Sequence, residues 1–319
     1  LVATASVDPS AMADGTQPNR SRLLPPAVHW FSDRVSSEPI AQWNMVIRLD
    51  LDFLPDSAHV DAAVAEVLRV HPMLRVRLEE TDSVREFVLT EACPVLFFFD
   101  TVEHEVTNAC KRVFNRLTGR VGIDNGTPIG FGVVRAMDSG AATIIVLAHH
   151  LVMDVVSLHI VAGDLIEAIA HGNDGARLPS ERTSVHEWVQ WLASDASAPG
   201  AYERCRAAYR GLTPTGADAG RVDPGTEGDA VSVHRSVPAA VIDAATAAIG
   251  ASVEEILQSA AVTAYAETAG ASPVVIEVET HGRELDAEGI DLTRTVGWFT
   301  GLSAVPVHPA TPGEQIAEI

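Results

Sequence analysis

The sequence predicts an α/β fold with α+β-type layering, organised as two lobes. Strand-like and helix-like apolar patterns alternate in both halves of the chain, as they do in layered domains. The 319 residues exceed one average domain of about 150 residues. Residues 211–230 are dense in Gly, Pro, Thr and Asp and have no periodicity, which indicates a boundary. We therefore expect a leader or linker over 1–22, an N-terminal lobe over 23–210, a linker over 211–230 and a C-terminal lobe over 231–319.

In the N-terminal lobe the strongest strand signal is the apolar run 143–148, which is typical of a central strand buried on both faces. Apolar residues then recur at helical spacing over 156–169, and Gly172 is placed to end that helix. Ser184 and Glu187 form a capping box for a further helix. The other expected elements are strands within 45–51, 75–89, 95–99 and 129–135, and helices within 60–68 and 108–117.

The C-terminal lobe is expected to begin with a strand over 231–237 and a short helix from Pro238. Ser252 and Glu255 form a second capping box, which starts the next helix. The apolar segment 274–278 is strand-like.

The composition excludes several classes of function. The chain has 22 Lys and Arg residues against 43 Asp and Glu, a net charge of −21, and such a surface repels nucleic-acid phosphates. Only one of the 22 is a lysine, Lys111, so Schiff-base chemistry has a single candidate residue. No apolar run reaches the about 18 residues of a membrane span, and 1–22 lack the order of a secretory signal. The three cysteines form neither a paired framework nor a metal motif, so we expect a cytoplasmic protein that binds neither membranes nor nucleic acids.

Two adjacent histidines, His149 and His150, follow the central strand, and Asp154 comes shortly after them. Catalytic groups often lie at such strand ends, where side chains project into a crevice. On the residues alone three interpretations are open: histidines satisfied at the edge of the core, a metal site, or a proton-transfer histidine whose turn is held by Asp154. Adjacent residues of an extended chain point to opposite faces, which disfavours a shared metal ion.

The segment 149–154, HHLVMD, matches the H-H-x-x-x-D motif, and through it the chain resembles the condensation and epimerization domains of nonribosomal peptide synthetases. The resemblance extends over nearly the whole chain. It implies two chloramphenicol acetyltransferase-like lobes that form a V-shaped pseudo-dimer with a central channel. Three further segments carry it: 24–31 (LPPAVHWF) is similar to an opening P-x-Q-x-W-F, 71–75 (HPMLR) to H-x-x-L-R, and 124–128 (DNGTP) stands at the place of a D-x-x-x-G-P-like turn.

Two later segments resemble the epimerization branch more closely than the condensation branch. Residues 279–284, ETHGRE, are similar to E-G-H-G-R-E, and residues 291–300, DLTRTVGWFT, to D-L-S-R-T-V-G-W-F-T. The resemblance implies an epimerase that inverts the Cα of an L-aminoacyl or peptidyl thioester held on the phosphopantetheine of a carrier domain. The implied partners are this peptidyl or aminoacyl carrier domain and adjacent synthetase domains, and the domain itself is expected to bind no cofactor and no metal.

Inverting a Cα centre is easiest with acid/base groups on two sides of the carbon. The resemblance places His150 of the first lobe and Glu279 of the second on opposite sides of the channel as the catalytic pair, with His150 also stabilising enolate charge. The sequence does not assign which of the two deprotonates the L-isomer. Without the resemblance, Glu279 at a strand end is an ordinary solvated carboxylate.

Other residues are expected to support the site. The resemblance implies that His149 supports His150 structurally and that Asp154 and Arg283 form a buried ion pair linking the lobes; on the residues alone, the two are independent surface charges. Trp298 is a candidate for the substrate channel, although it and Phe299 are expected more often as packing residues.

The chain departs from the family pattern at the expected channel. Val155 follows the motif aspartate where the family usually has glycine, and Thr280 replaces another glycine beside Glu279. Both are expected to narrow or stiffen the site, because a β-branched residue disfavours positive φ. His281 is a further channel candidate. The sequence ends before the family's F-N-Y-L-G-like segment, so we expect an incomplete second lobe.

Two other functions stay open. One is a condensation-type enzyme that forms an amide or ester, in which His150 orders or deprotonates the acceptor nucleophile. The other is a catalytically degenerate domain that docks a carrier or recruits a tailoring enzyme. Glu279 separates the first from an epimerase, since condensation proceeds without a carboxylate at that position.

Overall fold

The computed structural model describes two compact units, and each is considered by itself. The first contains residues 1–198 and 281–301, and the second contains 199–280 and 302–319. The described residues are 20–32, 43–81, 84–91, 94–172, 177–208, 231–269, 274–285 and 287–307.

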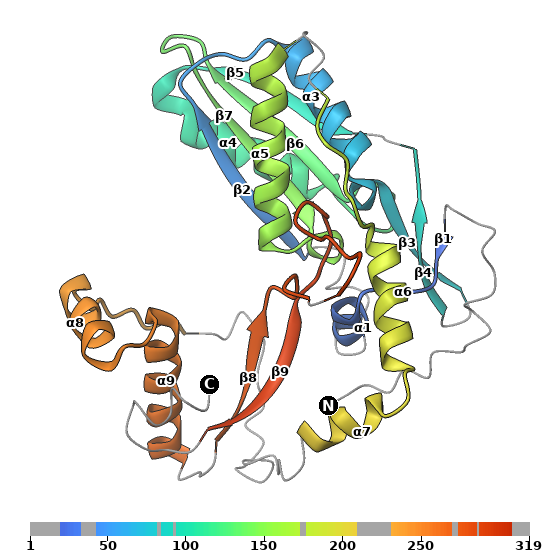
Figure 1. Cartoon of the computed structure of the whole chain (residues 1–319). Coiled ribbons are helices and arrows are strands. Elements are labelled where there is room, and N and C mark those ends of the chain that lie inside the picture. The colour runs from blue at the N-terminus through green and yellow to red at the C-terminus, as the bar shows by residue number, and fades with distance from the viewer. Residues whose placement is uncertain are drawn as a thin grey trace. The chain divides into compact units, whose positions relative to one another are not determined.

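A four-stranded mixed sheet forms the centre of the first unit (Figure 1). Its strand order is β2 (Asn44–Leu51), β7 (Ala141–His149), β6 (Ile129–Ala136) and β5 (Val95–Thr101). β7 is antiparallel to both neighbours, and β5 and β6 are parallel. The prediction of a central strand is confirmed, because alternate residues of β7 belong to two different apolar cores on its two faces.

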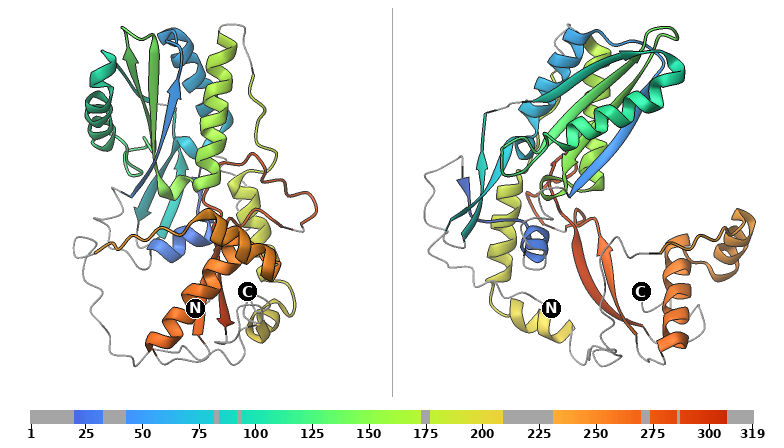
Figure 2. Two further views of the ribbon diagram at one scale, coloured as in Figure 1. Left: turned by 90° about the vertical axis from the view of Figure 1, so that its left-hand side faces the viewer. Right: turned by 180° about the vertical axis from the view of Figure 1, so that it is seen from behind.

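Helices cover both faces of this sheet. α3 (Ser57–Val70) and α5 (Val155–His171) lie on one face, and α4 (Val106–Thr118) lies on the other (Figures 1 and 2). α4 approaches β6 closely because Gly132 has no side chain; a Cβ there would collide with Val113 of α4. As predicted, α3 ends before Pro72 and α5 ends at Gly172, whose φ is +56°.

The remaining elements of the first unit are a small second sheet and several helices. A small sheet has the order β1–β4–β3. The capping box of Ser184 and Glu187 is confirmed at the start of α6. These elements are β1 (Arg20–Ser21), α1 (Pro26–Ser32), η2 (Pro72–Arg75), β3 (Val76–Thr81), β4 (Val84–Leu89), η3 (Glu103–Glu105), η4 (His150–Val152) and α6 (Val185–Ala196).

The expected leader over 1–22 is wrong at its end. Arg20 and Ser21 pair with β4, and the Arg20 guanidinium forms an ion pair with Glu79 at 2.9 Å and another with Glu86. Strand pairing and ion pairs hold these residues in place although they bury little apolar surface. A hydrophobicity pattern does not detect such interactions. Residues 1–19 lie outside the described part of the chain.

The second unit contains a helical pair and a two-stranded sheet. Its helix from Pro238 and the capping box of Ser252 and Glu255 are as predicted. The strand expected over 231–237 is wrong: these residues are irregular, and Val231 is 88% exposed, so the alternating valines bury no face. The elements are α7 (Ala201–Ala208), α8 (Ala239–Ile249), α9 (Val253–Ala269), β8 (Val274–Thr280) and β9 (Gly301–Val307).

The two units divide the chain differently from the expected lobes. Residues 281–301, expected in the C-terminal lobe, belong to the first unit, whereas α7 belongs to the second. The expected linker 211–230 lies outside the described residues. None of the described helices has the length and apolar character needed to cross a membrane.

Candidate functional site

The imidazole of His150 lies in a stack of aromatic rings, which we call the aromatic column. Its centroid is 4.1 Å from that of Trp43, with 9° between the ring planes, and Trp43 in turn stacks on Phe31 at 3.9 Å and 5°. Trp298 lies beside the column, 4.9 Å from His150 and 5.1 Å from Trp43. Three sequence segments noted separately, 24–31, 149–154 and 291–300, therefore meet at one place.

Strand register places Trp43 at His150. β2 pairs with β7 so that Asn44 is opposite His149, and Trp43 and His150 are the residues next to this last pair of the ladder. The His150 amide donates to the Trp43 carbonyl at 2.9 Å. Side chains of such a cross-strand pair lie on the same side of the sheet. Trp43 carried no signal in the sequence, because a pattern of alternating residues indicates a strand but not the strand with which it pairs.

His149 and His150 occupy different environments, as expected of adjacent residues. His149 is fully buried, its Nδ1 accepts from the Leu151 amide at 3.2 Å, and its own amide donates to the Pro128 carbonyl at 2.8 Å. It therefore stabilises the η4 turn, whereas His150 is only half-buried. Among the described residues, no group of three or more His, Cys, Asp and Glu side chains is arranged to hold a metal ion.

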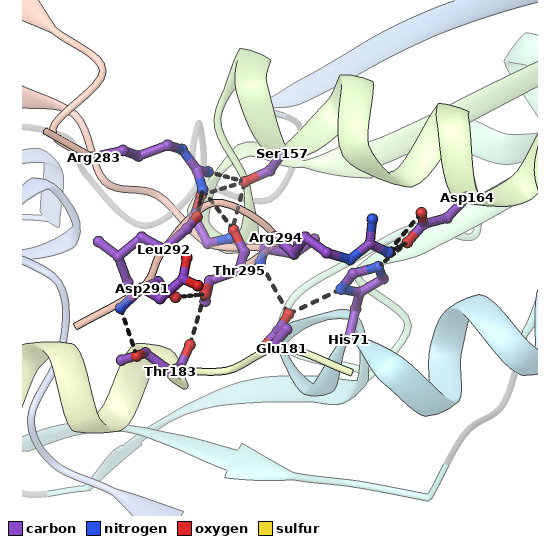
Figure 3. A network of polar contacts seen from close by, with 12 residues as sticks. His71, Ser157, Asp164, Glu181, Thr183, Arg283, Asp291, Leu292, Arg294 and Thr295 are labelled. Carbon is purple, nitrogen blue, oxygen red and sulfur yellow. Dashed lines mark hydrogen bonds and ion pairs between the residues drawn. The ribbon is translucent and has the colours of Figure 1, made fainter. Parts of the chain in front are cut away.

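The ion pair expected between Asp154 and Arg283 is present. Arg283 Nη2 lies 2.9 and 3.2 Å from the two Asp154 oxygens, and both side chains are less than a tenth exposed. Arg283 also donates through Nη1 to the carbonyls of Leu292 and Thr295, at 2.8 and 2.7 Å (Figure 3). The expected link between lobes differs from the structure, because Arg283 belongs to the 281–301 segment and so both partners lie in the first unit.

Asp154 has further roles at the start of α5. Its Oδ1 accepts from the Ser157 amide at 2.7 Å as the helix cap, and its Oδ2 accepts from the Phe299 amide at 3.2 Å. The Ser157 hydroxyl donates to the Gly297 carbonyl at 2.8 Å and accepts from the Gly297 amide at 3.0 Å. These bonds hold the chain next to Trp298, one side of the aromatic column. Sequence reasoning missed Ser157, since a serine in a first helical turn is an ordinary residue.

A second buried polar cluster anchors the same segment (Figure 3). His71, which is fully buried, has Nε2 2.8 Å from Asp164 and Nδ1 2.9 Å from Glu181. When Asp164 and Glu181 are ionised they only accept hydrogen bonds, and the His71 ring that donates to both of them is then the imidazolium. Arg294 donates to both Asp164 oxygens, at 2.8 and 2.7 Å, and the Val296 amide donates to Glu181 at 2.9 Å. Two positive and two negative side chains therefore balance in this cluster.

The charges of the cluster shift the pKa values of its members. Burial alone lowers the pKa of His71, but the contacts with Asp164 and Glu181 outweigh it and raise that pKa above 6.5. Burial likewise opposes ionisation of Asp164, but hydrogen bonds from His71 and Arg294 lower its pKa below the usual value. His71 was recognised only as part of the 71–75 segment, and its partners, far apart in the sequence, carried no signal.

Glu279 is at the carboxyl end of β8 in the second unit. It lines a hollow of about 580 Å³ between α9 and β8. Thr280, the last residue of β8, is exposed, and His281 is about half exposed with its Nε2 3.5 Å from Glu284. The other polar residues of the hollow are Glu254, Gln258, Tyr265 and Glu277.

Val155 and Trp298, two residues expected at the substrate channel, differ in solvent exposure. Val155 is the first residue of α5 and is 57% exposed. Its helical backbone needs no glycine, so the expected conflict between a β-branched residue and positive φ does not arise. Trp298 is 4% exposed, so it packs in the aromatic column.

The model of a family described as "Condensation domain" matches residues 29–318. Among curated proteins, the chain is 28% identical to chondramide synthase of Chondromyces crocatus over 340 residues, and 28% identical to a linear gramicidin synthase of Brevibacillus parabrevis over 302 residues. These alignments cover 99% and 89% of this chain but only 8% and 6% of the relatives, so the chain spans less than a tenth of their length.

Solved structures of low identity show the same fold. The epimerization domain from the third module of tyrocidine synthetase B matches with a TM-score of 0.72 at 20% identity, over 92% of this chain and 69% of that one. The first condensation domain of the CDA synthetase matches with a TM-score of 0.67 at 20% identity, over 92% and 72%. The predicted α+β fold of two condensation-type lobes is thereby confirmed.

Proposed function

Because this chain belongs to the condensation-domain family of nonribosomal peptide synthetases, we propose that it epimerizes an L-aminoacyl or peptidyl thioester to the D-isomer. The observation that carries the proposal is the carboxylate of Glu279, which opens the epimerization-like segment 279–284 at the end of β8. The 291–300 segment adds a second likeness to the same branch, and its Trp298 lies against His150.

In the proposed reaction, one of His150 and Glu279 removes the Cα proton and the other returns a proton to the opposite face. The Cα–H electron pair passes into the thioester carbonyl as an enolate, and it returns to Cα when the new C–H bond forms. After each L-to-D turnover, the group that took the Cα proton releases it to solvent and the other group takes up a proton from solvent, which restores both groups and is the route by which deuterium reaches Cα in deuterated water. The resemblance assigns the two groups to opposite sides of a channel, which the inversion requires.

We also propose the partners and cofactor requirements of this reaction. The substrate arrives on the phosphopantetheine of a peptidyl or aminoacyl carrier domain, and adjacent synthetase domains are the other partners. Proton transfer changes no oxidation state, and the thioester already acidifies the Cα proton, so the domain needs no redox cofactor or metal of its own.

The likeness to condensation domains favours a second candidate function. In a condensation reaction, His150 would order or deprotonate an acceptor amine or hydroxyl that attacks a donor thioester, and an amide or ester would form. No step of this condensation reaction requires the Glu279 carboxylate. The two candidates therefore differ in their response to substitution at that residue.

The test is incubation of the full-length protein with an L-aminoacyl carrier protein in deuterated water, followed by chiral analysis of the released amino acid. Epimerization gives the D-isomer and deuterium at Cα. Folded protein that gives neither, but joins the acyl group to an added acceptor, would establish condensation. Folded protein that gives no product of either kind would leave only carrier docking.

Variants test the assigned residues. We expect Glu279→Gln and His150→Ala each to lower the epimerization rate by about 100-fold or more, since general acid–base catalysis contributes about 10²–10⁴-fold. Glu277→Gln is the matched control, because Glu277 is an exposed carboxylate two residues earlier on the same strand. Deuterium exchange that survives both substitutions would show that the residue assignment is wrong while the activity is right.

A further inference from the structure

We propose that Trp43 is a positioning residue for His150: its indole holds the imidazole in the plane that the proton transfer needs. This inference rests on the proposed function, in which His150 exchanges a proton with Cα. Neither the sequence pattern nor the family motifs marked Trp43; it is singled out by its stacking distance of 4.1 Å and interplanar angle of 9° to the imidazole.

Backbone hydrogen bonding fixes the spacing of the two residues. Trp43 immediately precedes β2, and His150 immediately follows β7. All eight residues of β2 pair with β7, and the pair nearest to Trp43 and His150 is Asn44 with His149. The hydrogen bond from the His150 amide to the Trp43 carbonyl, 2.9 Å long, extends this ladder by one step. The indole therefore lies beside the imidazole because of strand register, and the two side chains start from fixed neighbouring positions.

The indole is itself held by other rings. Phe31 of α1 is 7% exposed and stacks on Trp43 at 3.9 Å with planes 5° apart. Trp298 meets Trp43 at 66°, edge to face, with centroids 5.1 Å apart. Trp298 is held in turn by the bonds of the Gly297 backbone to Ser157. Rotation of the Trp43 ring would break contacts with both neighbours, so the surface offered to His150 is rigid.

Stacking restricts the imidazole in a way that suits proton transfer. The contact uses a face of the imidazole ring, and both nitrogens direct their protons or lone pairs within the ring plane. A ring held parallel to the indole keeps those directions constant, whereas a turn of the imidazole would separate the stacked faces. An aromatic face also attracts a protonated imidazole, so the contact persists when His150 carries the proton. A misplaced catalytic group costs about 100-fold in rate.

The experiment separates positioning from packing. Trp43→Leu removes the flat face and Trp43→Phe keeps one. We expect Trp43→Leu to lower kcat for epimerization about 100-fold with KM unchanged within about twofold, and Trp43→Phe to restore most of the lost kcat. Trp188→Leu is the control: Trp188 is 4% exposed, more buried than the partly buried Trp43, and packs against Phe299, so its loss should lower stability and leave kcat near the wild-type value.

A spectroscopic measurement tests the same contact independently of activity. In the wild-type protein the carbon-bound protons of the His150 ring should show the upfield NMR shift of a proton above an indole face; the shift should disappear in Trp43→Leu and be reduced in Trp43→Phe. A wild-type kcat in folded Trp43→Leu, an equal loss of kcat in Trp188→Leu, or unchanged His150 shifts would overturn the inference. A wild-type protein that shows the expected upfield shift of the His150 ring protons but does not epimerize the substrate would instead refute the proposed function alone.

Discussion

Substitutions that break the ion pair between Asp154 and Arg283 should be among the single substitutions that lower the stability of the first unit most. Asp154→Ala removes three interactions: the cap of α5, the acceptor for the Phe299 amide, and the anion beside Arg283. A lost cap costs about 1 kcal/mol. The loss of one partner of a buried ion pair costs about 3–5 kcal/mol, because a buried charge is left without its counterion. Since such contributions are not additive, we expect Asp154→Ala to lower the free energy of unfolding by about 4 kcal/mol.

Urea unfolding followed by tryptophan fluorescence measures this loss specifically. All five tryptophans of the chain belong to the first unit, so their emission reports its unfolding. The double variant Asp154→Ala/Arg283→Met isolates the pair: removal of Arg283 abolishes the uncompensated charge, so the double loss should be smaller than the sum of the single losses by about 2 kcal/mol. A loss below about 1 kcal/mol for Asp154→Ala, or losses that simply add, would refute the reasoning.

Three further predictions concern the other anchors of the 281–301 segment. The raised pKa of His71 means that the imidazolium stabilises the fold fully below about pH 6.5 and loses this effect as pH rises through its folded pKa, so the difference in unfolding free energy between wild type and His71→Gln should narrow as pH rises above about 6.5 in urea titrations; a constant difference would contradict the ionised cluster. The pKa of Asp164 is lowered, so its contribution is present above about pH 3.9 and is lost as pH falls through the folded value; the difference between wild type and Asp164→Asn should shrink below about pH 4. Gly282→Ala should destabilise the first unit more than Gly289→Ala, because both glycines have positive φ, +65° and +83°, but only at Gly282 would a Cβ collide with the Phe299 carbonyl; equal melting temperatures for the two variants would show that the collision is relieved without cost.

Local signals in the sequence were sufficient for most of the first unit. The run 143–148 indicated a central strand because a strand buried on both faces has no polar alternation, and β7 has that position. The helix end at Gly172 and the helix start at the Ser184–Glu187 capping box were predicted correctly, because capping depends on residues that are neighbours in the sequence. The same reasoning failed over 231–237, where alternating valines have no partner surface among the described residues to cover them.

The motifs also identified most of the candidate site from the sequence alone. His149, His150 and Asp154 were recognised from one segment, and Arg283 and Trp298 from two others. What the motifs did not contain is the set of contacts between segments. Phe31 was part of a noted segment without a role, and Ser157 was not noted at all, although both hold the surroundings of His150 through residues distant in the chain.

The fold class, the family resemblance and the residue types available for proton transfer could all be predicted from the sequence, because they follow from patterns within short stretches of chain. The place of the 281–301 segment in the first unit and the stacking of Trp43 on His150 became visible only in three dimensions. Both depend on pairing between distant segments: buried ion pairs in the first case and the register of β2 against β7 in the second. A sequence pattern indicates that a strand or a charged residue is present. It does not indicate which distant strand or charge becomes its partner, because that depends on how the segments pack together.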